Sequence, residues 1–118
     1  MKARKPRIGV LAVGRSTFDV EFAQSVFGEA WRALQRLDAE LVGEARIHYE
    51  ADAALAAFAA LQGADIDLLL VVQVTFTDAA VVTAIAERLD VPLLLWTFPE
   101  QRTGGRLRLN SFCGANLA

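Results

Sequence analysis

The most constraining feature of this sequence is an apolar run without polar alternation, DLLLVVQVTF at residues 67–76. A strand with one face in water alternates apolar and polar residues, whereas a strand covered on both faces shows a continuous apolar run. The run therefore predicts a central strand of a parallel sheet with helices on both faces. IGVLAV at residues 8–13 and LLLWTF at residues 93–98 have the same character and predict two more strands.

Segments with helical periodicity separate these strands. Apolar residues recur at helical spacing from Asp19 to Leu37, which predicts an amphipathic helix. Residues 52–61 are rich in alanine and are followed by Gln62 and Gly63, so a second helix is expected to stop there. A third helix is expected to run to Leu89. The candidate caps are Ser16, Thr17 or Asp19 for the first helix and Thr77 or Asp78 for the third.

A less regular strand is expected at residues 40–47, where Gly43 interrupts the apolar pattern. Strands that alternate with helices over short connections imply right-handed crossovers between parallel strands. The fold class is therefore α/β: a three-layer α/β/α parallel sheet, flavodoxin-like, with strand order 2-1-3-4. The alternation in RLRLN at residues 106–110 is compatible with a short extra edge strand.

Length and composition favour one soluble domain. A chain of 118 residues suits a single core, with residues 1–7 as a basic N-terminal arm and residues 8–118 as the domain. No apolar run approaches the roughly 18 residues of a membrane span, so no membrane association is expected. Cys113 is the only cysteine, which favours the cytoplasm. Residues 8–98 hold five basic and thirteen acidic side chains, which argues against nucleic acid as a partner.

The end of the sequence suggests that the layered sheet needs more cover than the chain supplies. The strand at residues 93–98 should have a helix over it, yet only Phe112–Ala118 remain to form one. An average helix has roughly 10 to 14 residues. We interpret the chain as the amino-terminal part of a longer enzyme, or as one that needs a partner. The alternative is a complete four-stranded domain with a short C-terminal turn.

Three loops are candidates for a ligand site, because ligands of open parallel sheets bind beyond the carboxyl ends of the strands. These loops are residues 14–18, 73–78 and 99–110. Simple helix capping is the alternative for the hydroxyl groups, and Gln73 is expected either to reach solvent or to bond a loop backbone. His48, the only histidine, is expected on the surface or in a loop. The candidate side chains are Arg15, Ser16, Thr17, Gln73, Thr75, Thr77, Asp78 and Arg102.

Several common chemistries lack their residues. The sequence has neither GxGxxG nor GxxxxGK[ST], which argues against dinucleotide and P-loop phosphate binding. A receiver domain would want acidic residues where Val13–Gly14 and Val72–Gln73 stand. One histidine and one cysteine do not make a clustered metal site or a catalytic triad. The expectation is a small-molecule cleft with no catalytic residue and no metal ligand.

Two segments resemble a known family. VVQVTFTDAA and PLLLWTFPEQRTGGRLRLNSFCGANLA are similar to the amino-terminal part of proteins related to L-fucose isomerase and L-arabinose isomerase, especially the fucose-isomerase-like branch. The resemblance implies aldose–ketose isomerisation with a divalent metal, typically manganese, held in more carboxyl-terminal domains. It also implies a sugar ligand, a sugar site at a subunit interface and a homo-oligomer. It adds Phe76 and Asn110 to the candidate substrate-binding residues and transfers no catalytic role.

Two other functions remain open from the sequence. The chain could be a free-standing flavodoxin-like module that binds a small molecule or an anion with the loop at residues 14–18. It could also be a structural domain whose last strand pairs with another copy.

Overall fold

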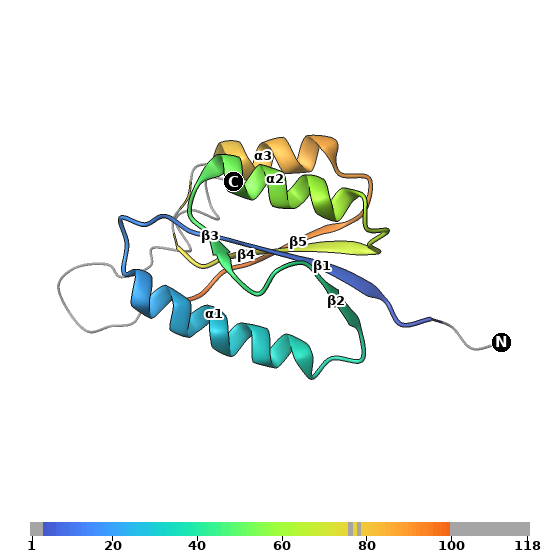
Figure 1. Ribbon diagram of the computed structural model, residues 1–118, viewed down its shortest axis with the longest axis horizontal. Helices are drawn as coiled ribbons and strands as arrows, with labels where there is room; N and C mark the ends of the chain where they lie inside the picture. The colour runs from blue at the N-terminus through green and yellow to red at the C-terminus, as the bar shows by residue number, and fades with distance from the viewer. Residues whose placement is uncertain (1–3, 76, 78, 100–118) are drawn as a thin grey trace.

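The computed structural model describes residues 4–75, 77 and 79–99. Strands and helices alternate along this part of the chain, except that β2 and β3 follow each other without a helix between them (Figure 1). The elements are β1 (Arg7–Val13), α1 (Val20–Gln35), β2 (Glu40–Val42), β3 (Ile47–His48), α2 (Ala51–Gln62), β4 (Leu68–Gln73), α3 (Ala79–Arg88) and β5 (Leu93–Trp96).

The strands form one parallel sheet in the order β2-β1-β4-β5, and β3 also pairs with β1. β4 lies between β1 and β5, as its continuous apolar run predicts. Its register with β1 extends from the Ile8–Leu68 pair to the Val13–Gln73 pair. The predicted α/β class and strand order are confirmed.

Helices cover both faces of the sheet, with α1 on one face and α2 and α3 on the other (Figure 1). Along the central strands β1 and β4, alternate side chains pack against the helices on opposite faces of the sheet. Val10, Ala12, Leu70 and Val72 pack with Phe27 and Leu34 of α1. Leu11, Val13, Leu69 and Val71 pack with Phe58 of α2 and Ile85 of α3. Helices therefore cover both faces of β1 and β4, which explains why the sequences of these strands lack polar alternation.

The single strand predicted at residues 40–47 is wrong, because the structure has two short strands there. β2 pairs with Arg7–Gly9 and β3 pairs with Ala12–Val13. Four residues, 43–46, therefore lie opposite only two residues of β1, Val10 and Leu11. Gly43 has φ +122°, a conformation that favours glycine, and the charged side chains of Glu44 and Arg46 are exposed. The chain forms a bulge here, and its register with β1 shifts by two residues between β2 and β3.

The described residues include β5 but not the segments that were expected to follow it. β5 is the strand next to β4, and the side chain of Leu94 is 56% exposed. The expected edge strand at residues 106–110 and the final helix at residues 112–118 lie outside the described residues. Within the described part of the chain, no helix has both the length and the apolar character required to cross a membrane.

Candidate functional site

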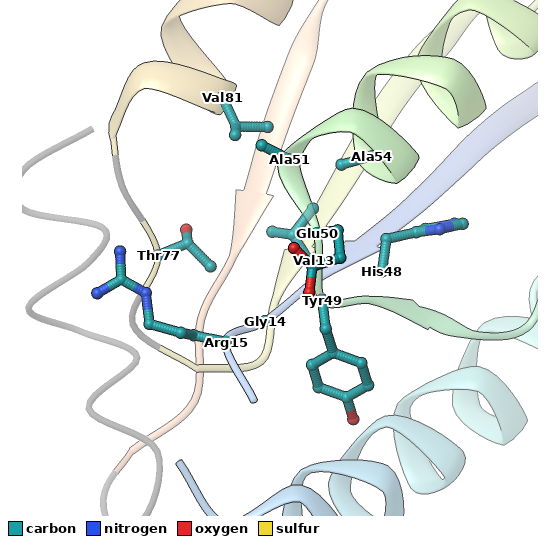
Figure 2. Close-up of a pocket in the computed structure, with 10 residues that line it drawn as sticks. All are labelled: Val13, Gly14, Arg15, His48, Tyr49, Glu50, Ala51, Ala54, Thr77 and Val81. Atoms are coloured by element: carbon teal, nitrogen blue, oxygen red, sulfur yellow. The ribbon is translucent and has the colours of Figure 1, made fainter. Parts of the chain in front are cut away.

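A pocket of about 100 Å³ lies at the carboxyl edge of the sheet. The ends of β1 and β3 form its floor, the first turn of α2 forms one wall, and the segment after β4 lies opposite (Figure 2). This is the edge at which parallel sheets bind ligands. The pocket is lined by Val13, Gly14, Arg15, His48, Tyr49, Glu50, Ala51, Ala54, Thr77 and Val81.

Hydrogen bonds from three strand ends hold the floor of the pocket. The Gly14 amide donates to the carbonyl oxygen of His48 at 3.1 Å, and the Val74 amide donates to the carbonyl oxygen of Val13 at 3.0 Å. The Arg15 amide donates to Oγ1 of Thr75 at 2.7 Å, and the Thr75 side chain is only 1% exposed. Thr75 therefore fixes the direction in which the chain leaves β1, and with it the place of Arg15.

Two of the helices that begin at this edge, α1 and α2, have different N-termini. The Asp19 carboxylate accepts a hydrogen bond from the Phe22 amide at 3.0 Å and caps α1, which confirms one of the predicted caps. An anion held by residues 14–18 would lie near this carboxylate, which argues against that loop as an anion cradle. The N-cap of α2 is Glu50, whose side chain makes no capping hydrogen bond. The N-terminus of α2 faces the pocket without a side-chain cap.

Two polar side chains that line the pocket are more than nine-tenths buried. Thr77 is 8% exposed and His48 is 6% exposed. Oγ1 of Thr77 and Nδ1 of His48 have no hydrogen-bond partner among the described residues. Burying a hydroxyl without a partner costs on the order of 1 to 3 kcal/mol, so an unbonded Thr77 hydroxyl is an unusual feature.

The expected surface or loop position of His48 is wrong. The bulge at residues 43–46 shifts His48 into β3, where it pairs with Val13 of β1. Burial lowers the pKa of the His48 imidazole below its usual value, and the nearby positive charge of Arg46 lowers it further, although Glu44 acts in the opposite direction. His48 is therefore neutral at pH 7 and adds no charge to the pocket.

The structure brings together some of the sequence-predicted site residues and separates others. Arg15 and Thr77 line the pocket, and Thr75 lies directly behind Arg15. Gln73 is completely buried at the end of β4, so it does not reach solvent. Ser16 and Thr17 are exposed in the turn before α1 and do not line the pocket. Phe76, Asp78, Arg102 and Asn110 lie outside the described residues.

Sequence reasoning missed the segment Tyr49–Ala51, which forms one side of the pocket. The irregular strand was expected to end at residue 47, and the loop after it was not counted among the strand ends. A usable signal was present: HYEAD at residues 48–52 follows the apolar residue Ile47 and leads directly into the alanine-rich helix. The rule for carboxyl ends of strands applies to that junction as well.

The pocket offers groups for binding a ligand rather than a metal ion. Arg15, the Thr77 hydroxyl and the amides at the start of α2 can donate hydrogen bonds, and the Glu50 carboxylate can accept them. Within residues 4–75, 77 and 79–99, no three His, Cys, Asp or Glu side chains lie close enough together to hold a metal ion. The described residues therefore do not fit the manganese that the family resemblance implies.

Comparison with known proteins identifies one family and several sulfoquinovose isomerases that resemble this chain. Residues 9–118 match the family described as fucose/sulfoquinovose isomerase, N-terminal domain. The sulfoquinovose isomerase of Clostridium sp. (strain MSTE9) is 36% identical over 113 residues, which cover 95% of this chain and 25% of that protein. The sulfoquinovose isomerase of Priestia aryabhattai is 31% identical over 104 residues, which cover 88% of this chain and 23% of that protein. No solved structure matches the chain.

The chain spans about a quarter of the length of these curated relatives. The family match includes residues 9–13 of β1, all of β4 and all of the residues that line the pocket. Together with the confirmed parallel α/β sheet, the match shows that this chain belongs to the fucose/sulfoquinovose isomerase N-terminal domain family.

Proposed function

We propose that the chain is the amino-terminal domain of an aldose–ketose isomerase and that it contributes sugar contacts through the pocket at the carboxyl edge of its sheet. The family match over residues 9–118 supports the enzyme class. The observation that carries the proposal is the pocket itself, in which donors and an acceptor surround a half-buried space. Sugars are bound by such combinations, because each hydroxyl group both donates and accepts hydrogen bonds.

The size of the pocket supports a site shared with other parts of the protein. Its volume is about 100 Å³. A closed cavity of roughly 150 Å³ holds a benzene-sized ligand, and a pyranose is larger than benzene. The pocket can therefore enclose one end of a sugar, while the rest of the ligand extends outward. We propose that a neighbouring subunit of a homo-oligomer, or another domain, covers that outer part.

The catalytic chemistry belongs, in this proposal, to groups outside the described residues. Isomerisation of an aldose needs an acid or base that moves a proton, and a metal can polarise the adjacent oxygens. A divalent metal such as manganese would be held by residues of those other domains. The role of the described residues is to bind and orient the sugar. We also propose that the protein acts in the cytoplasm.

The proposal is tested by thermal-shift measurements and by an activity assay on the purified chain. We expect sulfoquinovose or L-fucose to raise Tm, because each would bind the folded state only. We expect no conversion of either sugar when manganese is added, because this proposal places the catalytic groups in other domains. Turnover by the chain alone would contradict the proposed division of labour. A rise in Tm with flavin mononucleotide and none with sugars would favour a free-standing flavodoxin-like module.

A further inference from the structure

We propose that a cavity at the bulge between β2 and β3 binds a small neutral aromatic molecule with one hydroxyl group, such as a phenol. The hydroxyl group would bond to Nδ1 of His48, and we call the site the bulge cavity. The inference goes beyond the proposed function and does not depend on it, because the bulge cavity is not the pocket that is proposed to hold the sugar.

The bulge cavity forms where the edge of the sheet is interrupted. β2 pairs with Arg7–Gly9 and β3 pairs with Ala12–Val13, so residues 43–46 do not continue the pairing with β1. α2 adds two small side chains, Ala57 and Ala60, to the walls of this gap. The cavity is lined by Val10, Val42, Gly43, Glu44, His48, Ala57, Ala60 and Leu61.

His48 supplies one buried polar atom to the bulge cavity. Because His48 pairs with Val13 in a parallel register, its side chain lies on the face of the sheet that packs against α2. In Figure 2 the imidazole extends away from Arg15 and Thr77. The residue is 6% exposed, and Nδ1 has no hydrogen-bond partner among the described residues. A ligand with a hydroxyl group in the bulge cavity would satisfy this atom.

A hydroxyl group suits Nδ1 in either tautomer of the imidazole. Neutral imidazole has one nitrogen that donates and one that accepts, whereas a hydroxyl group can both donate and accept. Burial lowers the pKa of His48, so the imidazole is neutral at pH 7. The ligand therefore needs no charge to make this hydrogen bond.

The rest of the lining favours an apolar body without charge. Apart from His48 and Glu44, the lining residues are valine, leucine, alanine and glycine. The Glu44 carboxylate is exposed and lies 3.7 Å from the Arg46 guanidinium, and no arginine or lysine is among the described residues that line the cavity. Burying a charge or several sugar hydroxyl groups against such a lining costs free energy, because few hydrogen-bond partners replace water. A neutral ligand with a single hydroxyl group avoids this cost.

The volume of the bulge cavity fits one aromatic ring. The cavity holds about 200 Å³. A closed apolar cavity of roughly 150 Å³ binds benzene, whereas drug-sized ligands occupy pockets of roughly 300–1,000 Å³. A phenol with one further methyl group therefore suits the available space.

NMR titration of the purified chain with 4-methylphenol, toluene and 4-methylbenzoate tests the inference. We expect 4-methylphenol to bind roughly fivefold more tightly than toluene, because its hydroxyl group bonds to His48. Without that partner, burial of the hydroxyl group would weaken binding instead, so the order of the two affinities reports on His48. 4-Methylbenzoate is an anion and should not bind. The amides expected to shift are those of Gly43, Glu44, His48, Ala57 and Leu61.

Substitutions locate the site. Ala57→Leu should fill the bulge cavity and weaken both neutral ligands by at least about tenfold. Ala59→Leu makes the same change at an exposed position of α2 outside the lining and should leave both affinities unchanged. His48→Phe keeps a ring but removes Nδ1, so it should abolish the advantage of 4-methylphenol over toluene.

The wild-type chain and the Ala57→Leu variant decide the outcome even if His48→Phe does not fold. Equal affinities for 4-methylphenol and toluene, or no shift of the lining amides with 4-methylphenol, would overturn the inference. Unchanged binding in an Ala57→Leu variant that circular dichroism shows to be folded would overturn it as well. None of these results bears on sugar binding, so the proposed function is tested separately.

Discussion

Replacing Thr75 with valine tests how the sheet positions Arg15. Valine has nearly the same shape as threonine, so the fully buried site keeps its packing, but the acceptor of the Arg15 amide is lost. A partly buried amide without its 2.7 Å hydrogen bond costs about 1 to 3 kcal/mol. For a domain of 118 residues, about 2 kcal/mol corresponds to a fall in Tm of about 8 °C.

Thermal unfolding followed by circular dichroism measures the fall in Tm, and hydrogen exchange of the Arg15 amide shows where it arises. We expect the Arg15 amide to exchange much faster in Thr75→Val. Thr75→Ser keeps the hydroxyl and should keep the protection of that amide, although it loses about 1 kcal/mol with the buried methyl group. Unchanged protection of the Arg15 amide in the valine variant would refute the role assigned to Thr75.

Three further predictions concern stability and pH. Gly43→Ala should lower the free energy of unfolding by more than about 2 kcal/mol, because φ is +122° and a Cβ would meet a backbone oxygen at 2.7 Å. Gly63 has φ −81°, so Gly63→Ala should change the free energy of unfolding by less than about 1 kcal/mol. Equal effects of the two substitutions in urea unfolding would contradict this. The Arg7 amide donates to the Asp67 carboxylate at 2.7 Å and is the main cause of the lowered pKa of Asp67, so Asp67→Asn should lower Tm at pH 7. The difference in Tm should shrink as the pH falls below about 4, because the carboxylate is then protonated in the unfolded state and, at still lower pH, in the folded state. A difference that does not shrink as the pH falls from 5 to 2 would contradict this. Because the pKa of His48 is lowered, the neutral imidazole stabilises the fold fully above pH 6.5, and this stabilisation declines as the pH falls below that value. His48 is the only histidine, so NMR titration of its imidazole should give a pKa under 6.5. A pKa of 6.5 or higher would contradict the prediction.

The strands that carry the most information in the sequence are those buried on both faces. The runs at β1 and β4 predict a central parallel pair, because their apolar side chains pack against one helical layer or the other. Asp19 was one of three plausible caps, and the structure selects it through its bond to the Phe22 amide. Local pattern sufficed for these features because burial and capping depend on residues close in the sequence or on a simple periodicity.

The bulge between β2 and β3 could not be predicted in the same way. Its position depends on how residues 40–48 pair with β1, which lies more than 30 residues away in the sequence. Glycine at position 43 allowed the turn but did not specify it. The burial of His48 and the place of Glu50 in the pocket both follow from that pairing. The predicted Arg15 and Thr77 reached the pocket because the residues that follow β1 and β4 were assigned to the carboxyl edge of the sheet, although the strand predicted at residues 67–76 ends at Gln73 in the structure.

The most direct test of the account is to map sugar binding onto the chain by the shifts of its backbone amide signals in NMR spectra. The central claim is that the carboxyl edge of the sheet holds the sugar. Addition of sulfoquinovose should shift the amides of Gly14, Arg15, Ala51 and Thr77 most strongly. A separate pocket lies between α1 and residues 45–49, and Trp31 and Arg32 line it. Shifts confined to the amides of α1 at that pocket, or no shifts at a saturating sugar concentration, would contradict the claim.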